Sequence, residues 1–283
     1  MPNPTERNPR DFPSVQLNTR GGASAEIILY GAHAVSWKPA NRQSEHLFVS
    51  DRARYESGSA IRGGVPVIFP QFADRGPLVK HGFARVQPWR LLSESQNTDG
   101  SACALLELTA NPETRKLWPH EFTAHYKVAL TDDQLDMQLQ IINTGATNFH
   151  FTAALHTYLA VGDIDATRLH GLKGCAFLER GEQQMTAEHR DQLAFAEALD
   201  RVYGDTDGPL TLVSPAQQTQ LRAEGFADTV VWNPWAEGCA AMDDMADDDY
   251  RKMLCVEAAG VLKPIQLRKG ESWIGRQILI AGQ

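Results

Sequence analysis

The amino-acid sequence predicts an all-β protein, a large antiparallel sandwich with few short helices. Apolar and polar residues alternate with a period of two along many short segments, which is typical of half-buried strands. Turn signals separate these segments about every eight to twelve residues, a spacing that favours a sandwich over strands alternating with helices. Helical periodicity is weak throughout the chain.

The length of 283 residues fits a single sandwich domain, which we expect to span residues 15–283. The proline-rich residues 1–14 are predicted to form a flexible N-terminal arm. The hydrophobic fraction of 42% and the charged fraction of 22% are ordinary for a globular protein. A chain of this length buries enough surface to fold without a disulfide or metal staple.

Two hairpins are the clearest elements. Alternating residues over Phe122–Leu130 and Leu135–Ile141 flank a short polar turn. A second hairpin is predicted to run over 88–94 and 104–108. The step Asp99-Gly100 lies between its two runs and supplies the residues that a tight turn requires.

Further strands are predicted from shorter alternating or apolar runs. They are expected at Ala25–Tyr30, Ala34–Trp37, Val65–Phe69, Phe149–Leu159, Arg168–Leu178, Leu210–Val213, Gln218–Ala223, Thr229–Trp232, Lys252–Glu257, Gln266–Arg268 and Ser272–Ile280. A short helix is predicted at Asp191–Leu199, and one helical turn at Pro112–Leu117. The aspartate-rich residues 243–249 lack the central glycine of a calcium loop, so a solvated loop is expected there.

Charge and cysteine content limit the partners. A net charge of −8 argues against nucleic acid or an anionic membrane surface, although local cations can still bind a small anion. The four cysteines form no CxxC pair, which indicates free thiols in a reducing compartment. The N-terminus has no apolar core of a secretory signal, and no run is long enough to span a membrane. We expect a cytoplasmic monomer that binds a small molecule.

Several common catalytic motifs are missing. The sequence has no GxxxxGK[ST] phosphate loop and no strand-linked GxGxxG. It also has no GxSxG nucleophile turn and no HExxH zinc motif. Nucleotide-dependent, nicotinamide-dependent and metalloprotease functions are therefore disfavoured, and neither a metal nor a cofactor is expected.

Two ionisable residues lie inside apolar, strand-like runs: His156 within 151–160 and Glu257 within 253–259. A buried carboxylate costs several kcal/mol unless it is paired, so Glu257 is either paired or functional. A histidine in such a strand is more often a satisfied core residue than a catalytic one. Taken alone, these two residues leave both interpretations open.

Cations gather around two glycine-rich segments, 61–72 and 80–85. The first contains Arg62, and the second contains Lys80, His81 and Arg85. An acidic protein that concentrates cations around exposed backbone can bind a phosphate or a carboxylate. Ordinary surface ion pairing is the alternative, and the residues alone do not decide between the two.

Eight segments, in this order, resemble the aldose epimerase superfamily, and most closely its hexose-6-phosphate mutarotase branch. The similarity spans the chain from about Leu17 to Ile280. Each segment is weakly specific, but their order along the chain makes the resemblance strong. The matching segments are Tyr30-Gly-Ala-His33 with Ser36-Trp37, Arg62-Gly-Gly-Val-Pro66 with Phe69-Pro70, His81-Gly-Phe-Ala-Arg85, Leu155-His-Thr-Tyr158, Asp200-Arg-Val-Tyr203, Val231-Trp-Asn-Pro-Trp235, Val256-Glu257 and Pro264-Ile-Gln-Leu-Arg-Lys-Gly-Glu-Ser-Trp273.

The resemblance implies a fold, the galactose mutarotase-like β-supersandwich, and a catalytic pair. It identifies His156 and Glu257 as the residues that open and reclose a sugar ring. We assign Glu257 as the base that takes the C1 hydroxyl proton and His156 as the acid that protonates the ring oxygen. This assignment expects a protonated His156 beside an ionised Glu257, and no cofactor.

The resemblance also implies a substrate grip, whose members would surround an aldohexose 6-phosphate. Arg62 and Arg85 correspond to phosphate-binding arginines, His81 to a sugar-contacting histidine, and Asp200 to a residue that holds ring hydroxyls. Lys80 is a departure, because many relatives carry glutamine there. An added cation fits an anionic substrate but changes the hydrogen bonding.

Three other functions remain open at this point. The first is an aldose 1-epimerase acting on neutral sugars, the second a carbohydrate-binding sandwich without catalysis. The third is a glycoside hydrolase or lyase, which normally needs two carboxylates at the bond. Trp232 and Trp235 are either faces for a sugar ring or core residues, and core packing is favoured.

Overall fold

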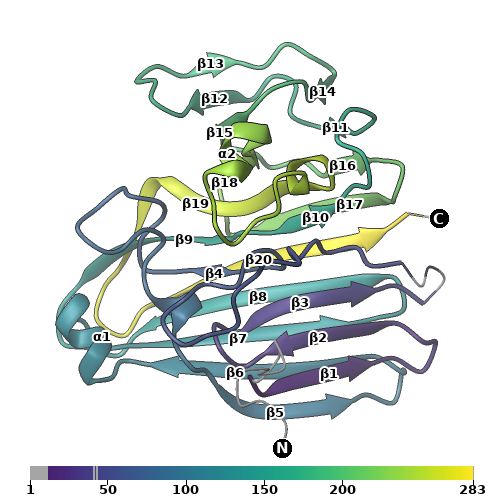
Figure 1. Cartoon of the computed structure of the whole chain (residues 1–283). Coiled ribbons are helices and arrows are strands. Elements are labelled where there is room, and N and C mark those ends of the chain that lie inside the picture. The colour runs from purple at the N-terminus through teal and green to yellow at the C-terminus, as the bar shows by residue number, and fades with distance from the viewer. Residues whose placement is uncertain (1–11, 41, 43, 283) are drawn as a thin grey trace, which may run out of the picture.

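The computed structural model describes residues 12–40, 42 and 44–282, and strands make up most of it. All pairs between the named strands are antiparallel, which confirms the predicted fold class (Figure 1). Residues 1–11 of the predicted arm lie outside the described residues. The end of that arm packs on the sandwich: Phe12 stacks on Tyr30 with ring centroids 4.4 Å apart, and Ser14 begins the first strand.

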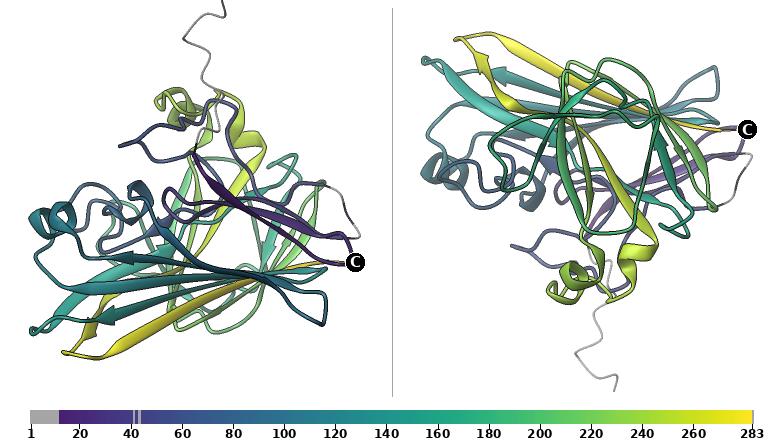
Figure 2. Two further views of the ribbon diagram at one scale, coloured as in Figure 1. Left: turned by 90° about the horizontal axis from the view of Figure 1, so that it is seen from below. Right: turned by 90° about the horizontal axis from the view of Figure 1, so that it is seen from above.

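A three-stranded sheet opens the chain. Val15 and Leu17 point inward from its first strand and join the main core with residues of the nine-stranded sheet. The small sheet accordingly lies against the larger one, as the two views in Figure 2 show. Its strands are β1 (Ser14–Asn18), β2 (Ser24–Ile28) and β3 (His33–Lys38).

The nine-stranded sheet contains both predicted hairpins. Leu130 faces Leu135 across the first, which is confirmed together with its turn. In spatial order its strands are β14 (Gln192–Ala194), β11 (Arg168–His170), β16 (Leu210–Val213), β17 (Gln218–Glu224), β20 (Ser272–Ala281), β8 (Gln134–Asn143), β7 (Phe122–Leu130), β6 (Ala102–Thr109) and β5 (Arg90–Gln96).

The eight-stranded sheet carries the candidate site. Its middle strands are buried on both faces, so they read in the sequence as continuous apolar runs. In spatial order the strands are β13 (Thr186–Ala187), β12 (Ala176–Glu179), β15 (Leu199–Gly204), β18 (Asp228–Asn233), β19 (Met253–Leu267), β9 (Phe149–Leu155) and β4 (Val67–Ile68), with β10 (Tyr158–Ala160) also paired to β19.

Helices are few and short within the described residues. They are α1 (Pro112–Leu117), α2 (Trp235–Ala240) and the 3₁₀ turns η1 (Ala84–Val86) and η2 (Asp249–Arg251). The predicted turn at α1 is confirmed, and the side chain of Asn111 caps it by accepting from two backbone N–H groups. No helix among the described residues is long and apolar enough to cross a membrane.

The helix predicted at Asp191–Leu199 is wrong. This segment contains β14 and ends at the first residue of β15. Leu193 and Phe195 are buried between exposed neighbours, so the apolar residues follow a period of two rather than a helical period. Pairing of β14 with β11 therefore overrides the helical propensity of the alanines and the one glutamate in the segment 191–199.

Several strand limits also differ from the prediction. The segment 149–159 is interrupted at 156–157, and 168–178 contributes strands to two different sheets. The predicted strands at 252–257 and 266–268 are parts of one long strand, β19. A period of two shows that a segment is extended, but it does not show where the chain changes sheets.

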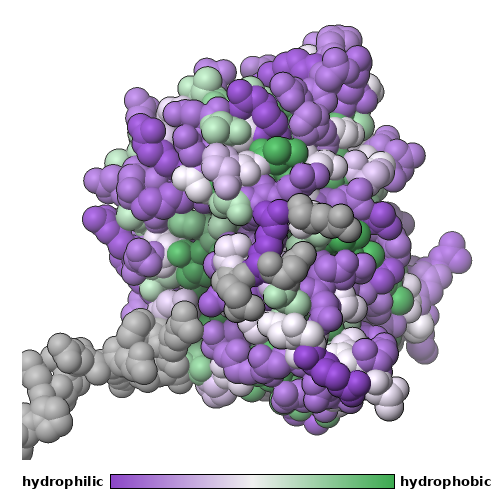
Figure 3. All heavy atoms as spheres, turned by 90° about the vertical axis from the view of Figure 1, so that its right-hand side faces the viewer, coloured by the Kyte–Doolittle hydropathy of each residue, from purple (hydrophilic) through white to green (hydrophobic). Residues whose placement is uncertain are grey.

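The surface is mixed. On the face drawn in Figure 3, polar spheres surround small green groups. Six large apolar side chains among the described residues are exposed, and they are spread along the chain at Val79, Leu92, Leu117, Met185, Val213 and Ile274. Single exposed apolar residues of this kind are normal on a globular protein.

Candidate active site

The register of β9 and β19 brings the two predicted catalytic residues together. Leu155 faces Ala258 across the two strands, so the next position on each side pairs His156 with Glu257. The Nδ1 atom of His156 lies 3.3 Å from Oε1 of Glu257, and the side chains are 9% and 1% exposed. Two residues about a hundred positions apart in the chain thus meet because neighbouring strands fix them.

Three strands place further side chains on the same face of the sheet. Asp200 on β15 faces Trp232 on β18, and Trp232 faces Cys255 on β19. Side chains two positions apart point to the same face of a strand, so Glu257 shares the face of Cys255. Asp200, Trp232 and Glu257 accordingly line one cavity.

The loop that carries Arg62 passes close to the backbone of its neighbours. Gly63 and Gly64 both have positive φ, at 112° and 61°. A Cβ atom at Gly63 would lie 2.3 Å from the carbonyl oxygen of Phe48, so only glycine fits there. His33 Nε2 lies 2.6 Å from the Gly63 carbonyl oxygen, which adds a buried anchor under the loop.

His81 enters the site from a tight turn, with φ at 67°. Its Nδ1 accepts a hydrogen bond from the backbone N–H of Ala73 at 3.3 Å, so Nε2 carries the proton of the neutral ring. Burial lowers the pKa of His81 to about 2, and the cations of Arg85, Lys80 and Arg62 add to this effect. His81 is therefore a neutral donor in the site at physiological pH.

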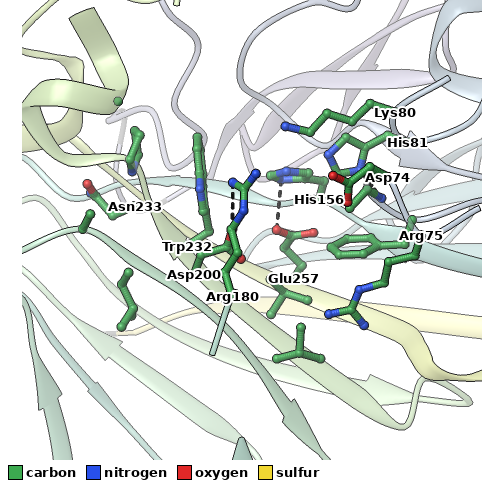
Figure 4. A pocket seen from close by; sticks show the side chains of 18 of the residues that line it. Asp74, Arg75, Lys80, His81, His156, Arg180, Asp200, Trp232, Asn233 and Glu257 are labelled. Atoms are coloured by element: carbon green, nitrogen blue, oxygen red, sulfur yellow. Dashed lines mark hydrogen bonds and ion pairs between the residues drawn. The ribbon is translucent and has the colours of Figure 1, made fainter. Parts of the chain in front are cut away.

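One cavity of about 890 Å³ collects these groups (Figure 4). Strands of the eight-stranded sheet form its floor, and the segment 72–85 borders it. The seven site residues predicted from the sequence all line it, namely Arg62, Lys80, His81, Arg85, His156, Asp200 and Glu257. The structure thus brings the predicted set together, while the role of each residue stays a prediction.

Burial acts against charge on the central pair. It lowers the pKa of His156 well below the ordinary value, and neighbouring His81, Arg85 and Arg62 lower it further. Burial raises the pKa of Glu257 well above its ordinary value, and Asp200 adds to the rise. The imidazolium and carboxylate expected from the sequence are therefore not the form that burial favours.

The polar atoms of this pair are also poorly satisfied. Nδ1 of His156 and Oε2 of Glu257 are buried without a hydrogen-bond partner among the described residues. The 3.3 Å contact between the two side chains is close enough for an ion pair but is not aligned as a hydrogen bond. Buried polar groups are normally paired, so these atoms are positioned for a partner that the folded chain does not itself supply.

The cationic part of the cavity is built differently. Arg62 contacts the Asp244 carboxylate through Nε at 3.2 Å and Nη2 at 3.1 Å, and its Nη1 donates to the Tyr158 hydroxyl at 3.1 Å. Arg85 donates from Nη2 to the backbone carbonyl of Lys80 at 2.9 Å. Partial burial and the cations of Arg180, Arg62 and Arg85 lower the pKa of Lys80.

Aromatic rings surround the His156 imidazole. Tyr158 stacks on it with ring centroids 4.8 Å apart, while His81 and Trp232 approach at 5.4 Å and 6.0 Å. Trp232 lines the cavity, as one sequence interpretation expected. Trp235 does not line the cavity and packs on Tyr250, which agrees with its alternative interpretation as a packing residue.

Sequence reasoning missed Arg180 and Asp244. Arg180 lies 3.4 Å from the Asp200 carboxylate and lines the cavity, although its local sequence looks like a charged turn. Asp244 belongs to the acidic run 243–249, for which a solvated loop was expected. That expectation is wrong for two residues. Asp244 is only 20% exposed and pairs with Arg62. Asp249 is buried and accepts a hydrogen bond from Ser50 Oγ at 2.6 Å.

A metal site is not indicated in the part of the chain that the structure describes. No cluster of three histidine, cysteine, aspartate or glutamate side chains there has a metal-binding arrangement. The four cysteines are free thiols, and Cys239 and Cys255 are buried.

A family model described as aldose 1-epimerase matches residues 13–279. Two curated relatives carry the name "Putative glucose-6-phosphate 1-epimerase". The one from Cenchrus ciliaris is 36% identical over 97% of this chain and 86% of its own length. The one from Escherichia coli K12 is 37% identical over 83% of this chain and 79% of its own length.

Solved structures agree with this match. A "putative mutarotase" from Salmonella typhimurium superimposes with a TM-score of 0.85 at 29% identity, covering 92% of this chain and 88% of its own. A galactose mutarotase related enzyme from Lactobacillus acidophilus has a TM-score of 0.75 at 14% identity, which supports the fold alone. The family model and the curated relatives together cover the whole sandwich and the site within it. The chain belongs to the aldose 1-epimerase family.

Proposed function

We propose that this protein is a hexose-6-phosphate mutarotase, which interconverts the α and β anomers of glucose 6-phosphate or a related aldohexose 6-phosphate. The observation that carries the proposal is one cavity that holds both a buried His–Glu pair and a cluster of cations. The pair supplies acid and base for ring opening, and the cations supply a grip for a phosphate. The names of the curated relatives support the same substrate.

The reaction needs two proton transfers at one hemiacetal. Glu257 takes the proton of the C1 hydroxyl, the C1–O5 bond breaks, and His156 gives a proton to O5. The open-chain aldehyde then turns about the C1–C2 bond. On reclosure O5 returns its proton to His156 and bonds to C1, while the C1 oxygen recovers a proton from Glu257, so the sequence ends with the residues as they began.

The proton count of the pair suits this sequence. A neutral His156 beside a protonated Glu257 holds the same number of protons as an imidazolium beside a carboxylate. Transfer of one proton from Glu257 to His156 converts the form that burial favours into the form that the reaction uses, and it requires the two side chains, 3.3 Å apart, first to align as a hydrogen bond. A substrate hydroxyl that donates to Glu257 stabilises the carboxylate and so favours this transfer.

The remaining groups bind and orient the sugar. Arg62 and Arg85 bind the phosphate by charge-assisted hydrogen bonds, which anchors the substrate while C1 rotates. His81 donates from Nε2 to a sugar oxygen, and Asp200 accepts from ring hydroxyls. Lys80, with an ammonium that faces the same cavity in Figure 4, adds to the attraction for the anion.

An anomerisation assay tests the proposal. Freshly dissolved α-glucose 6-phosphate is followed by polarimetry or NMR with and without enzyme, because sugar phosphates also anomerise spontaneously. We expect catalysed equilibration, with kcat/KM higher for glucose 6-phosphate than for glucose. Equal or higher kcat/KM for glucose would instead support the alternative, an aldose 1-epimerase for neutral sugars.

We further propose a cytoplasmic location and a monomeric state. The four free thiols fit a reducing compartment. Fractionation of the source cells and light scattering of the purified chain test the two statements. Recovery in a secreted fraction, or a mass near twice 31.3 kDa, would contradict them.

A further inference from the structure

Aromatic rings surround the imidazole of the proposed acid and help to orient it. Nδ1 of His156 has no hydrogen-bond partner among the residues that the structure describes. The imidazole instead lies nearly parallel to the Tyr158 ring, with an interplanar angle of 11° at 4.8 Å. His81 and Trp232 contact it edge-on, at 62° and 87°. Movement of Tyr158 would therefore move the face against which His156 stacks.

Tyr158 is also bonded to one of the proposed phosphate ligands. Its buried hydroxyl accepts a hydrogen bond of 3.1 Å from Nη1 of Arg62. The same guanidinium is held by Asp244 through its other edge. The planar guanidinium holds its donors in one rigid fork, so a phosphate that draws Arg62 toward it changes the hydrogen bond to Tyr158 as well.

We propose that Tyr158 is a positioning residue that couples anion binding at Arg62 to the orientation of His156. A phosphate dianion then activates ring opening even when it is not bonded to the sugar. Binding energy from a part of the substrate that does not react is in this way used at the reacting centre. The inference rests on the proposed function, because it requires ring opening and an anion site in the same cavity.

The test divides the substrate into two pieces. The sugar piece is α-D-xylose, an aldose without C6 or phosphate, and the anion piece is the phosphite dianion. Mutarotation of xylose is followed by polarimetry at increasing phosphite, and the rate without enzyme is subtracted because phosphite itself catalyses the reaction. The activation factor is kcat/KM with saturating phosphite divided by kcat/KM without it.

Tyr158→Phe keeps the ring and removes the hydroxyl. In the wild type we expect phosphite to raise kcat/KM, and in Tyr158→Phe we expect the activation factor to fall about tenfold, as for a hydrogen bond to a charged group. Tyr126→Phe is the matched control. It also removes a buried hydroxyl, but one that has no hydrogen-bond partner in the described chain and lies outside the cavity. Its activation factor should equal that of the wild type.

Each outcome decides the inference. Loss of activation in Tyr158→Phe alone supports it. Wild-type activation in Tyr158→Phe overturns it, and so does an equal loss in Tyr158→Phe and Tyr126→Phe. If Tyr158→Phe does not fold, the wild type still decides, since failure of phosphite to activate overturns the coupling. A wild type that equilibrates glucose 6-phosphate but shows no phosphite activation loses only this inference, whereas one that equilibrates neither sugar loses the proposed function.

Discussion

The cavity has a strand half, with His156 and Glu257, and a loop half, with the cations around Arg62, and the two hold their side chains in different ways. Glu257 lies on β19 and His156 directly follows the paired strand β9, and each retains a buried polar atom without a partner among the described residues. Arg62 comes from a loop, and Asp244 and Tyr158 between them engage three of its nitrogen atoms. The sheet therefore holds the acid–base pair in place but leaves some of its polar atoms without hydrogen bonds. At Arg62, by contrast, the loop supplies a charge that Asp244 already neutralises in part.

This difference indicates which half of the cavity performs proton transfer and which half attracts the anion. Groups that exchange protons with a substrate need hydrogen-bonding atoms that the fold leaves unpaired. The rigid sheet, rather than hydrogen bonds from neighbouring side chains, therefore holds these groups in position. Groups that only attract an anion can be held by other side chains, because a guanidinium has donors to spare. Variants in the first half should change turnover, and variants in the second should change affinity, except that Tyr158 links anion binding at Arg62 to His156 and so to turnover.

The largest effect is expected at the strand half. Glu257→Gln keeps the shape but removes the base, so kcat for glucose 6-phosphate should fall about 10²–10⁴-fold in the anomerisation assay. Glu188→Gln is the matched control, because Glu188 is also a buried carboxylate but pairs with Arg190 outside the cavity. Its folded fraction should turn over at the wild-type rate. Wild-type turnover by Glu257→Gln would remove Glu257 from the reaction.

The next effect is expected at the loop half. Arg85→Ala should raise KM for glucose 6-phosphate about 10–100-fold, the worth of one or two hydrogen bonds to a charged group, with a smaller change in kcat. KM for glucose should change much less. Arg222→Ala, at an exposed arginine that bonds to Gln220, serves as the control. An unchanged KM for the phosphorylated sugar would place the phosphate elsewhere.

The strand half of the cavity could be predicted from the sequence better than the loop half. Alternation over Phe122–Leu130 predicts a strand because side-chain direction repeats every two residues, and β7 has those limits. His156 and Glu257 stand out because polar residues in apolar strands need a reason. Pairing between distant loops has no comparable local signal, so the contact of Asp244 with Arg62 could not be predicted.

Elements that depend on tertiary contacts were missed for the same reason. The strand β14 spans only Gln192–Ala194, and its neighbours in the sequence favour helix as much as strand. Arg180 lies in a polar turn that resembles any solvated loop, and only the position of β15 brings Asp200 to it. The local alternation of apolar and polar residues determines which face of a strand is buried, whereas contacts between loops depend on the packing of the whole domain.

A stability measurement sharpens the comparison at Glu257. The folded pKa is raised by burial, so above pH 4.5 the unfolded chain releases a proton that the folded chain keeps. Folding stability is therefore lost as pH rises toward the folded pKa. Glutamine cannot ionise, so Glu257→Gln should melt about 2 °C or more above the wild type at pH 7.5, and less above it at pH 4.

The control has the opposite sign. Hydrogen bonds from Arg190 lower the pKa of Glu188 to about 2, so its stabilising effect is present above pH 4.5 and is lost as pH falls toward the folded value. Glu188→Gln should accordingly lower the melting temperature at pH 7.5. Calorimetry at the two pH values measures both variants. A Glu257→Gln gain that is independent of pH would show that the carboxyl is not the source of the instability.

The smallest effect is expected at Lys80, which breaks the pattern of the loop half. Its ammonium has neither a hydrogen bond nor an ion pair within the described ranges, and the residue is exposed. Water and salt screen such a charge, so Lys80→Gln should raise KM for glucose 6-phosphate no more than about fivefold, and less at high salt. KM measured at two ionic strengths checks this. A rise as large as that of Arg85→Ala would mean that the ammonium contacts the phosphate directly, and that this unpaired loop cation is as essential to the grip as the arginines.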